Sequence, residues 1–371
     1  MKIAHVVTYV SPDGAFGGPV RVALGQAAAL AERGHEVTVY AASPPQLAGT
    51  IEESGYTLRT FAAKRLSSRG GFASMTSWQL TRALRQDLRS IDVAHVHLAR
   101  DLVTIPAARA IQSAGVPFVL QPHGMIDATD RLLAKPLDFV ATRPLLRSAR
   151  LVLVLTDREA LDVREIEPRA NIQRIGNGVK VGAVPTYSGR DNVVLYLARL
   201  HQRKRPFAFV KMAEILKDEL PETQFILVGS DAGEGQAVLN AINESGLSSR
   251  VKWRGALAPE QTQTLLSSVL AYVLPAVDEV FPMTILESFQ AGTPVVTTDS
   301  LGIASTCERY GAAMITDGSP AQLAEAVRRV LADTTLADRL RLGGSKYLRE
   351  ELDVSAVAGQ LESIYQRATT P

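Results

Sequence analysis

The sequence predicts an α/β fold built from two Rossmann-like domains, and three observations favour it. The chain has 371 residues, which is more than one hydrophobic core usually holds. Short apolar runs alternate with helical patterns, as they do in parallel βαβ units. The same alternation starts again at Asn192, after a polar stretch with glycine at 182–190. We therefore expect a first domain over residues 1–183, a second domain over 184–353 and a final helix over 354–371.

The composition is that of an ordinary globular protein, with 46% hydrophobic and 21% charged residues. A net charge of +2 gives no general attraction for nucleic acid, so no nucleic-acid partner is expected. The single cysteine, Cys307, cannot form an internal disulfide and fits a reducing compartment. The apolar run from Ile3 to Val7 is too short for a secretory signal, and no run is long enough to span a bilayer. We expect a cytoplasmic protein, and contact with a membrane surface remains open.

The first domain begins with a βαβ pattern. Ile3 to Thr8 is an apolar, β-branched run, a helical pattern covers Val20 to Arg33, and Glu36 to Ala41 is the next predicted strand. A turn containing Gly17 and Gly18 lies at the carboxyl end of the first strand, where open α/β sheets bind ligands. The G-x-G-x-x-G fingerprint is missing, and the second strand does not end in an acidic residue, which disfavours a dehydrogenase. A plain tight turn is the alternative.

Further predicted elements of this domain are helical patterns over 75–89 and 102–114, and strands over 93–98, 118–121, 151–155 and 171–175. His95 and His97 alternate along one of these strands and so point to one face of it. A metal site would need a third ligand, and none lies nearby, so packed histidines are the preferred interpretation. His123 follows the strand over 118–121 at its carboxyl end, where parallel sheets bind ligands. A structural or exposed loop histidine is the alternative.

A basic amphipathic stretch with a helical pattern covers residues 131–150, and we expect one helix there. Its basic residues are Arg131, Lys135, Arg143, Arg147 and Arg150, and they are mixed with leucine, phenylalanine and valine. Asp138 is its one acidic residue. Such a pattern is typical of helices that dock on anionic membranes. It is also the pattern of a solvated helix face, which is the commoner case. Peripheral membrane contact through 131–150 is therefore one option that the sequence leaves open.

The second domain opens with a predicted strand over Asn192 to Ala198, and basic residues follow it directly. Arg199 and Lys204 lie at the carboxyl end of this strand, where two cations could neutralise a diphosphate. A solvated basic loop is the alternative, and we interpret Arg203 and Arg205 as spectators of that kind. Further elements are predicted as helices over 207–220, 320–332 and 336–348, a helix starting at Pro259, and strands over 224–228, 251–255, 270–274 and 295–298.

Two glutamates eight positions apart frame a predicted helix start. Pro282 suits the first turn of a helix, which puts Glu279 in the loop before it and Glu287 inside it. Glu287 then lies about 7 Å further along the axis, at about 1.5 Å per residue, which is roughly the length of a diphosphate. The helix terminus at Met283 and Thr284 offers amide groups and a partial positive charge to an anion. The pattern predicts a sugar nucleotide laid over this terminus.

These motifs resemble those of a known enzyme family. The spacing E-x7-E from Glu279 to Glu287, with Phe281 two residues after the first glutamate, is similar to a motif of the retaining glycosyltransferases of sequence family 4. The spacing R-x4-K from Arg199 to Lys204 resembles the diphosphate clamp of the same family. The resemblance covers nearly the whole chain. It implies the GT-B fold, in which two Rossmann-like α/β/α domains face a cleft and the C-terminal helix crosses back to the first domain.

The resemblance also implies a reaction. A sugar would pass from a nucleotide diphosphate sugar, with UDP- and GDP-sugars favoured, to a hydroxyl acceptor held mainly by the first domain. The acceptor would be a surface polysaccharide, a glycolipid or a small molecule. Transfer would retain the anomeric configuration, and since no D-x-D motif is found we expect no metal and no other cofactor. The implied catalytic residues are His123, Arg199, Lys204 and Glu279, and the implied donor-binding residues are Gly17, Gly18, Gly229, Arg254, Phe281, Met283, Thr284 and Glu287.

The resemblance assigns a role to each of the main residues. Arg199 and Lys204 would hold the diphosphate, Glu279 would orient the sugar, and Glu287 would hold the ribose. His123 would lie beside the donor sugar, where its backbone and ring would stabilise the developing oxocarbenium ion and hold a sugar hydroxyl. Gly229 would form a turn near the diphosphate. The strand that ends near Arg254 would bind the base through its backbone.

One position departs from the family, and two other functions remain open. Pro282 stands where many family members have glycine, and it has no N–H to offer the donor. The amides of Met283 and Thr284 would have to serve instead. A sugar-nucleotide 2-epimerase of the same fold would bind the same kind of donor without an acceptor. A catalytically silent sugar-nucleotide sensor is the other alternative, and the intact glutamates and cations argue against it.

Overall fold

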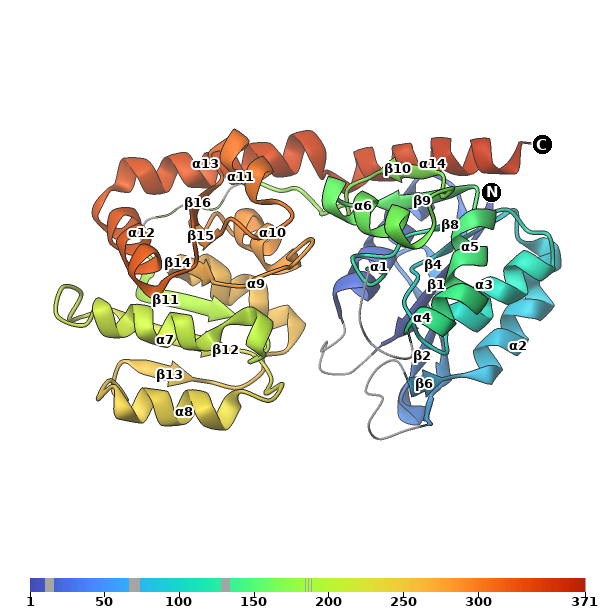
Figure 1. Cartoon of the computed structure of the whole chain (residues 1–371). Coiled ribbons are helices and arrows are strands. Elements are labelled where there is room, and N and C mark those ends of the chain that lie inside the picture. The colour runs from blue at the N-terminus through green and yellow to red at the C-terminus, as the bar shows by residue number, and fades with distance from the viewer. Residues whose placement is uncertain are drawn as a thin grey trace. The chain divides into compact units, whose positions relative to one another are not determined.

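The computed structural model describes residues 1–10, 17–66, 74–127, 134–183, 185, 187 and 189–370. The chain forms two compact units (Figure 1). The first unit contains Met1–Lys180 together with Leu352–Pro371, and the second unit contains Val181–Glu351. The last segment of the chain therefore belongs to the first unit. Among the described residues, no helix has the length and apolar character needed to cross a bilayer.

The first unit is built on an eight-stranded sheet in the order β10-β9-β8-β7-β1-β2-β4-β3. Its strands are β1 (Lys2–Tyr9), β2 (Glu36–Ser43), β3 (Gly49–Glu53), β4 (Tyr56–Ala62), β7 (Val93–Val96), β8 (Phe118–Leu120), β9 (Leu151–Val154) and β10 (Ile172–Arg174). All neighbours are parallel except β3 and β4, which form an antiparallel pair. A second, two-stranded sheet joins β5 (Lys64–Arg65) and β6 (Met75–Thr76).

Side chains alternate between two cores on either side of the main sheet. Ile3 and Val7 of β1 face a core shared with α1 (Gly17–Glu32) and α14 (Val354–Thr369). Ala4 and Val6 face the other core. The helices that supply buried residues to that second core are α2 (Trp78–Asp87), α3 (Thr104–Ser113), α5 (Arg143–Ser148) and α6 (Asp157–Ile166), and short helical turns lie at Pro45–Leu47 and Leu88–Ser90. Because helices cover both faces, the strands are apolar on both sides, as parallel strands usually are.

The chain leaves and re-enters the first unit at one place. Val179 N donates to Leu352 O at 2.7 Å, and Val354 N donates to Val179 O at 3.0 Å. Gly178 has a φ of 80°, and a Cβ atom there would lie 3.2 Å from a methyl carbon of Val354. The two passages of the chain are therefore tied together by backbone hydrogen bonds just before α14 begins.

The second unit contains a parallel six-stranded sheet in the order β13-β12-β11-β14-β15-β16. Its strands are β11 (Asp191–Leu197), β12 (Gln224–Val228), β13 (Val251–Trp253), β14 (Val269–Leu274), β15 (Val295–Thr298) and β16 (Ala313–Thr316). This is the doubly wound Rossmann order, in which the strand sequence reverses between β11 and β14. Ligands of such sheets bind outside the carboxyl ends of the strands at that point. A ligand-binding site is therefore expected at the loops after β11 and β14.

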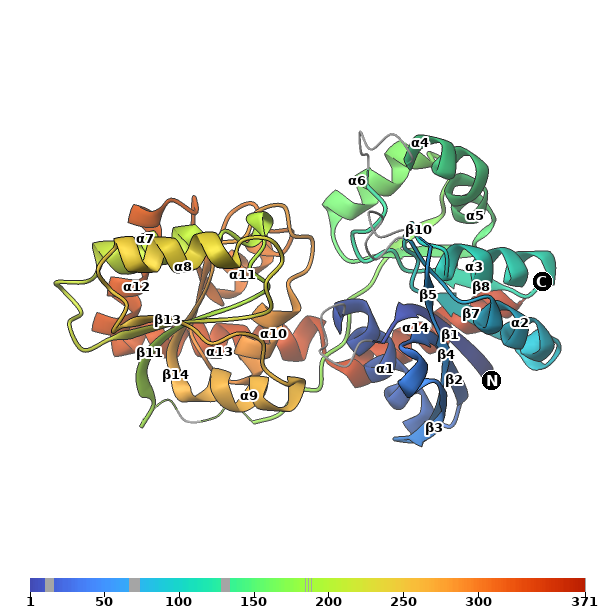
Figure 2. The same cartoon turned by 90° about the horizontal axis from the view of Figure 1, so that it is seen from below.

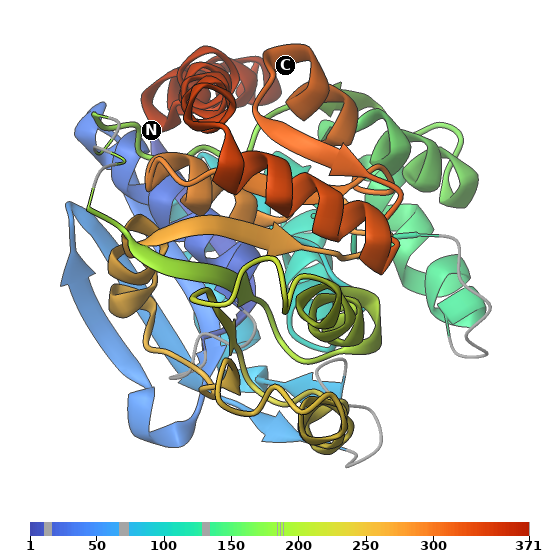
Figure 3. The same cartoon turned by 90° about the vertical axis from the view of Figure 1, so that its left-hand side faces the viewer.

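Helices cover both faces of this sheet. One face carries α7 (Pro206–Ile215), α8 (Gly235–Glu244) and α12 (Pro320–Ala332), and α7 and α8 run side by side (Figures 1 and 3). On the other face are α9 (Pro259–Ser268), α10 (Met283–Gln290), α11 (Ala304–Tyr310) and α13 (Thr334–Glu351). Figure 2 shows α7 and α8 on one side of the strands and α9 on the other.

Two predicted helices differ from the structure. The helix expected from residue 75 starts only at Trp78, because Met75 and Thr76 pair with Lys64 and Arg65 as a strand. The stretch predicted as one helix over 131–150 is interrupted, and 131–133 lie outside the described residues. It consists of α4 (Ala134–Leu137), a π-helix over Asp138–Thr142 and α5. Prolines within α4 and at the start of α5 have no N–H to donate, so a continuous α-helical ladder cannot form.

Candidate active site

The loops after β11 and β14 bring a cation and a carboxylate together. Lys204 ends a 3₁₀ turn (Gln202–Lys204) that follows β11, and Glu279 lies in the loop after β14. Lys204 Nζ is 2.5 Å from Glu279 Oε1, and the two side chains are 20% and 24% exposed. Glu279 Oε2 is buried and has no hydrogen-bond partner among the described residues. The structure thus joins two of the residues that the sequence proposes for the site.

Arg203, interpreted from the sequence as a spectator of the diphosphate clamp, contacts the loop that carries Glu279. Its guanidinium donates to the carbonyl oxygen of Asp278, and its own carbonyl oxygen accepts from Val277 N at 2.9 Å. Gly302 N donates to Glu279 O at 2.9 Å from the other side. Asp278 has a φ of 51°, a left-handed conformation that needs such support. Arg203 therefore joins the turn after β11 to the loop that carries Glu279.

Two buried tyrosines lie among these charged groups, with Tyr196 Oη donating to Arg199 O at 3.1 Å and Tyr272 Oη to Thr284 Oγ1 at 2.7 Å. Burial, together with the charges of Glu279 and Glu287, raises the pKa of Tyr272 well above its usual value. Burial and the charge of Glu279 also raise the pKa of Tyr196, and the nearby Arg199 opposes this. Both carboxylates thus act on one hydroxyl, and Glu279 and Arg199 act on another. Arg199, Glu279 and Glu287 share one electrostatic neighbourhood in the second unit.

The helix start predicted at Pro282 is shifted by one residue. Helix α10 begins at Met283, and Pro282 is the residue before it, with a φ of −74° and a ψ of 104°. Thr284, in the first turn, accepts a hydrogen bond from Tyr272 Oη at 2.7 Å. Glu287 is the fifth residue of the helix and is half-buried. Glu279 precedes the helix and Glu287 lies inside it, as the sequence predicts.

Gly229 lies where only glycine fits. Its φ is 149°, and a Cβ atom there would lie 1.9 Å from the carbonyl oxygen of Ala198, directly before Arg199. Its carbonyl oxygen accepts from Trp253 Nε1 at 2.9 Å. The turn at Gly229 therefore packs against the backbone that presents Arg199. Arg254 N donates to Leu227 O at 2.9 Å, and the Arg254 side chain is exposed.

In the first unit, His123 lies in a strained turn held by a buried glutamate. His123 and Gly124 have φ values of 53° and 73°. Gly124 N donates to Glu159 Oε1 at 2.6 Å, and Leu155 N donates to Glu159 Oε2 at 2.7 Å. Burial raises the pKa of Glu159 to about 7. Glu159 was missed by sequence reasoning, because only the fold brings α6 next to the loop after β8.

The histidines of the neighbouring strands form a cluster. His5 pairs in register with His95, so the expectation that His95 and His97 lack a nearby third potential ligand is wrong. All three are buried. Both ring nitrogens of His5 and of His97 already take part in hydrogen bonds, so a cation could bind only by breaking several of them. Packed, hydrogen-bonded histidines remain the better interpretation.

The glycine turn after β1 is only partly described. Residues 14–16 lie outside the described residues, and Gly17 and Gly18 form the start of α1, three residues before the predicted helix start. A Cβ atom at Gly18 would meet no atom within 4 Å, so the described structure does not require glycine there. Phe281 is half-buried and lies two residues before α10. The donor-binding roles of these residues remain predictions.

Two family profiles match the chain. One, described as a glycosyl transferase 4-like domain, matches residues 17–178, and the other, described as glycosyl transferases group 1, matches residues 184–347. The chain is a group 1 glycosyltransferase. The glycosyltransferase family that the sequence motifs resemble is thereby confirmed, and retention of configuration stays a prediction.

Curated relatives of this glycosyltransferase are also transferases. The D-inositol 3-phosphate glycosyltransferase of Corynebacterium diphtheriae is 23% identical over 417 aligned positions, covering 98% of this chain and 94% of the relative. The 2-deoxystreptamine glucosyltransferase of Streptomyces kanamyceticus is 26% identical over 311 positions, covering 74% and 77%. Neither is an epimerase.

Solved structures support the same fold. The structure of Anabaena HepE in complex with UDP and glucose has a TM-score of 0.78 and 20% identity to this glycosyltransferase, and it covers 99% of each chain. A sucrose-phosphate synthase from Thermosynechococcus elongatus has a TM-score of 0.75 and 19% identity, covering 99% of this chain and 98% of that one. The predicted two-domain, Rossmann-like GT-B fold is confirmed.

Proposed function

We propose that this glycosyltransferase moves a sugar from a UDP- or GDP-sugar, bound by the second unit, to a hydroxyl acceptor bound by the first. Transfer retains the anomeric configuration and needs no metal. The observation that carries the donor site is the buried oxygen Glu279 Oε2, which has no hydrogen-bond partner among the described residues. Leaving such an atom without a partner costs about 1–3 kcal/mol. A sugar hydroxyl is a small donor that would satisfy it.

The diphosphate is the second part of the donor that this site suits. Lys204 gives one of its three ammonium hydrogens to Glu279, so two remain for phosphate oxygens. Arg199 adds a second cation in the same electrostatic neighbourhood. The N-terminus of α10 adds the equivalent of about half a positive charge. These groups would stabilise the charge that grows on the leaving diphosphate, which is where electrostatic catalysis contributes most.

The other parts of the donor are assigned to the remaining motifs of the second unit. Glu287, inside α10, would bind the ribose hydroxyls, and the strand end at Arg254 would bind the base through its backbone. Support comes from the doubly wound order of the sheet, which places the ends of β11 and β14 side by side. The UDP and glucose bound by HepE, a protein of the same fold, favour a uridine donor.

The acceptor belongs to the first unit in this proposal, with His123 taking part in transfer. The two curated relatives are named for D-inositol 3-phosphate and 2-deoxystreptamine, which are both polyhydroxylated rings. They support an acceptor rich in hydroxyl groups, whether free, lipid-linked or part of a glycan. Retention is supported by the E-x7-E resemblance, since that motif belongs to retaining enzymes.

A thermal-shift panel tests the donor. The full chain is heated with UDP-, GDP- and ADP-sugars and with the free nucleotides. A donor at 100 times its Kd stabilises the folded protein by about 2.7 kcal/mol, which is about 5–10 °C for a unit of this size. Because Glu279 is proposed to bind the sugar, Glu279→Gln should reduce the shift with the nucleotide sugar and leave the shift with the free nucleotide unchanged.

The panel has a contradicting outcome, and the product gives two further checks. If no nucleotide sugar raises the melting temperature, the proposed donor site is wrong. The anomeric proton of the product, observed by NMR before it can mutarotate, should show the configuration of the donor. Activity should also persist in excess EDTA. Inversion of configuration, or complete loss of activity on chelation with rescue by added metal, would overturn those parts of the proposal.

The proposal includes a peripheral membrane contact through α4, the π-helix and α5. Asp138 is buried and accepts from Arg100 Nε at 2.9 Å, so the acid of this stretch does not offset its exposed cations. Phe139 and Val140 are 72% and 64% exposed. Exposed apolar side chains beside arginines are the features that anchor a protein to an anionic lipid surface.

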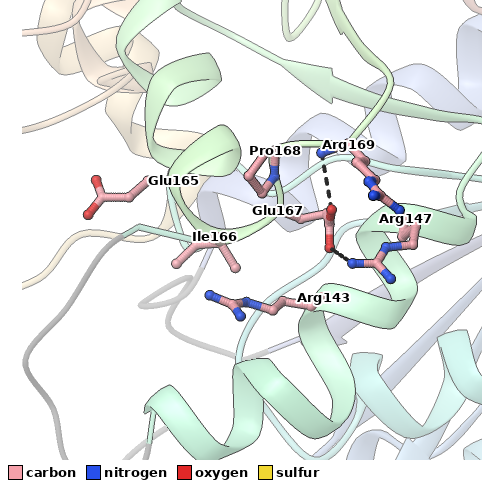
Figure 4. Close-up of a pocket in the computed structure, with 7 residues that line it drawn as sticks. All are labelled: Arg143, Arg147, Glu165, Ile166, Glu167, Pro168 and Arg169. Carbon is pink, nitrogen blue, oxygen red and sulfur yellow. Dashed lines mark hydrogen bonds and ion pairs between the residues drawn. The ribbon is translucent and has the colours of Figure 1, made fainter.

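A hollow of about 500 Å³ lies beside this stretch (Figure 4). It is lined by Arg143, Arg147, Glu165, Ile166, Glu167, Pro168 and Arg169. Glu167 accepts from Arg147 Nη2 at 2.7 Å and from Arg169 N at 3.1 Å, so part of its negative charge is already compensated. Arg143 would be available to a lipid phosphate.

Vesicle sedimentation tests the membrane contact. The chain should sediment with vesicles that contain about one third anionic phospholipid and stay in solution with neutral vesicles. The double variant Phe139→Ser, Val140→Ser should bind several-fold less. Trp78→Ser removes another exposed apolar residue of the first unit and serves as the matched control, since Trp78 is 64% exposed on α2. Equal binding by all three proteins would contradict the proposal.

A further inference from the structure

A row of four histidines and a tyrosine runs through the first unit. His5 lies in β1, His95 in β7, His97 directly after β7, and His123 after β8. Tyr365 reaches this row from α14. His5, His95, His97 and Tyr365 are at most 1% exposed. A row of polar rings in an otherwise apolar core requires partners for every ring, because an unpaired buried polar group is costly.

Each member of the row is hydrogen-bonded to the next. His123 Nε2 is 2.7 Å from His97 Nδ1, and His97 Nε2 is 3.2 Å from His5 Nδ1. His5 Nε2 is 3.3 Å from Tyr365 Oη, which is 2.7 Å from His95 Nδ1. Burial lowers the pKa of all four histidines, to about 3 for His5 and His123. Each ring is therefore neutral at pH 7, with one donor and one acceptor nitrogen.

The two ends of the row select the direction of its hydrogen bonds. The His123 ring is also hydrogen-bonded to the side chain of Asn177, whose Oδ1 accepts from Gln121 Nε2 at 3.3 Å. Because His123 Nε2 faces His97, the contact with Asn177 falls to Nδ1, and an oxygen acceptor there would place the proton on Nδ1. At the other end, His95 Nε2 is buried and has no hydrogen-bond partner among the described residues. A bare nitrogen is tolerated there better than an unpaired N–H.

The contacts at both ends of the row therefore favour the same set of tautomers, in which every histidine carries its proton on Nδ1. His97 then donates to His123, His5 donates to His97, and the Tyr365 hydroxyl donates to His5. If one residue of the row is replaced, the histidines on either side of it are no longer held in one tautomer, because each loses a hydrogen-bond partner. With both nitrogens bound to protein groups, the His123 ring anchors its own left-handed backbone and has no nitrogen left for a sugar hydroxyl, so its expected part in transfer would fall to the backbone.

We propose that His97 and Tyr365 are positioning residues for sugar transfer, because they fix the tautomer of His123 and hold its left-handed backbone in place. The proposal rests on the proposed role of His123 in the reaction. It makes α14, the last helix of the chain, part of the support for a loop that follows β8. Tyr365 is separated from His95 by 270 positions in the sequence.

The test combines imidazole NMR with kinetics on the full chain. The protein has six histidines, so ¹⁵N-histidine labelling gives a short list of signals. Wild type should show His123 as the Nδ1–H tautomer. Tyr365→Phe removes only a hydroxyl, and it should shift the His123 ring toward a mixture of tautomers. It should also lower kcat about tenfold with KM for the donor within about twofold, by analogy with the partners that orient metal-binding histidines, whose loss costs 10–100-fold.

A second pair of variants tests the donor to His123 directly. The amide of His97→Gln can still donate to His123 Nε2, whereas His97→Leu cannot. We expect kcat to fall in the order wild type, His97→Gln, His97→Leu. Equal loss in both variants, with unchanged His123 signals, would overturn the proposal.

Two matched controls separate this effect from general loosening of the first unit. His35→Gln alters another contact with α14, since His35 Nε2 is 3.5 Å from Glu362. Tyr40→Phe removes another tyrosine hydroxyl, which donates to Asp87 at 2.8 Å. Both should keep wild-type kcat and His123 signals. The proposal fails if Tyr365→Phe behaves like these controls, or if the controls change as much as Tyr365→Phe does.

The experiments distinguish failure of the positioning proposal from failure of the proposed function. If His123→Ala kept full activity, the role of His123 in transfer would be wrong, while the NMR signals would still report whether the row fixes its tautomer. If His123→Ala were inactive and Tyr365→Phe changed neither the signals nor kcat, only the positioning proposal would be wrong.

Discussion

Lys204→Ala is expected to lower kcat by about 10²–10³-fold, which is the usual cost of removing one preorganised group that stabilises charge in the transition state. Lys204 lies 2.5 Å from Glu279 and has hydrogens left for the departing diphosphate. Its removal would take away the cation where negative charge grows and would leave the Glu279 carboxylate without its partner. The measurement is nucleotide release in the presence of an acceptor, with the donor identified by thermal shift.

The control for this prediction is a lysine that carries the same charge outside the site. Lys211 lies on α7 and pairs with Glu214 at 2.8 Å, with its side chain 61% exposed. Lys211→Ala should change kcat less than twofold, because surface ion pairs contribute little. If Lys204→Ala kept more than about a third of the wild-type kcat, the assignment of Lys204 to the diphosphate would be wrong.

The melting temperature of the first unit is expected to fall by at least about 4 °C between pH 7.5 and pH 5. Burial lowers the pKa of His5 and of His123 from 6.5 to about 3. On acidification, the unfolded chain therefore binds protons at these residues before the folded chain does. The free energy of unfolding is unaffected by them above pH 6.5 and falls as the pH is lowered from 6.5 towards 3. At pH 5 each histidine has lowered the free energy of unfolding by about 2 kcal/mol, at 1.36 kcal/mol per pKa unit.

Glu159 works in the opposite direction. Burial raises its pKa from 4.5 to about 7, so the folded state binds the proton before the unfolded state does. Acidification to pH 5 therefore raises the free energy of unfolding by about 2 kcal/mol at this residue. The balance of His5, His123 and Glu159 is then a loss of about 2 kcal/mol, and the lowered pKa values of His95 and His97 add to it. A loss of this size corresponds to about 4–8 °C for a unit of roughly 200 residues.

Calorimetry of the full chain at several pH values checks this expectation. Carboxylates with lowered pKa values, such as Glu362, lose their contribution only below pH 4.5, so they do not obscure the window between pH 7.5 and 5. Glu159→Gln should make the fall with acidification steeper, because the opposing group no longer titrates. A first unit that is equally stable or more stable at pH 5 would contradict the burial of these histidines as neutral rings.

The meeting of the loops that carry Lys204 and Glu279 could be predicted from the sequence, because both loops follow strand ends. Arg199 and Glu279 come directly after apolar runs, and parallel strands place such residues at one edge of a sheet. The order of the strands then joined β11 to β14. Lys204, five residues after Arg199, reaches Glu279 through a short 3₁₀ turn. Spacing along the chain was sufficient because each residue is close to the end of its own strand.

The supporting residues could not be found in this way. His5 meets His95 only through the register of β1 and β7, which no local pattern states. Glu159 meets Gly124 only because α6 packs near the loop after β8. Arg203 stands between Arg199 and Lys204 in the sequence, which does not reveal its contact with Asp278. That contact depends on how the loop after β14 folds back. Contacts between distant segments decide these positions.

Local patterns were also misleading where a distant partner competes with them. Met75 and Thr76 suit the start of a helix, but the antiparallel partner at Lys64 and Arg65 draws them into a strand. The helix then starts after Ser77, a residue type that favours the position before a helix.

The return of α14 to the first unit determines how this enzyme could be recombined with a relative. A gene fragment that stopped at Lys180 would encode a sheet whose apolar face has lost Val357, Leu361 and Ile364. A hybrid with a different sugar-nucleotide specificity should therefore exchange residues 181–351 as an internal cassette. Both ends of the polypeptide would then come from one parent, and the tie between Val179 and Leu352 would mark the two splice points.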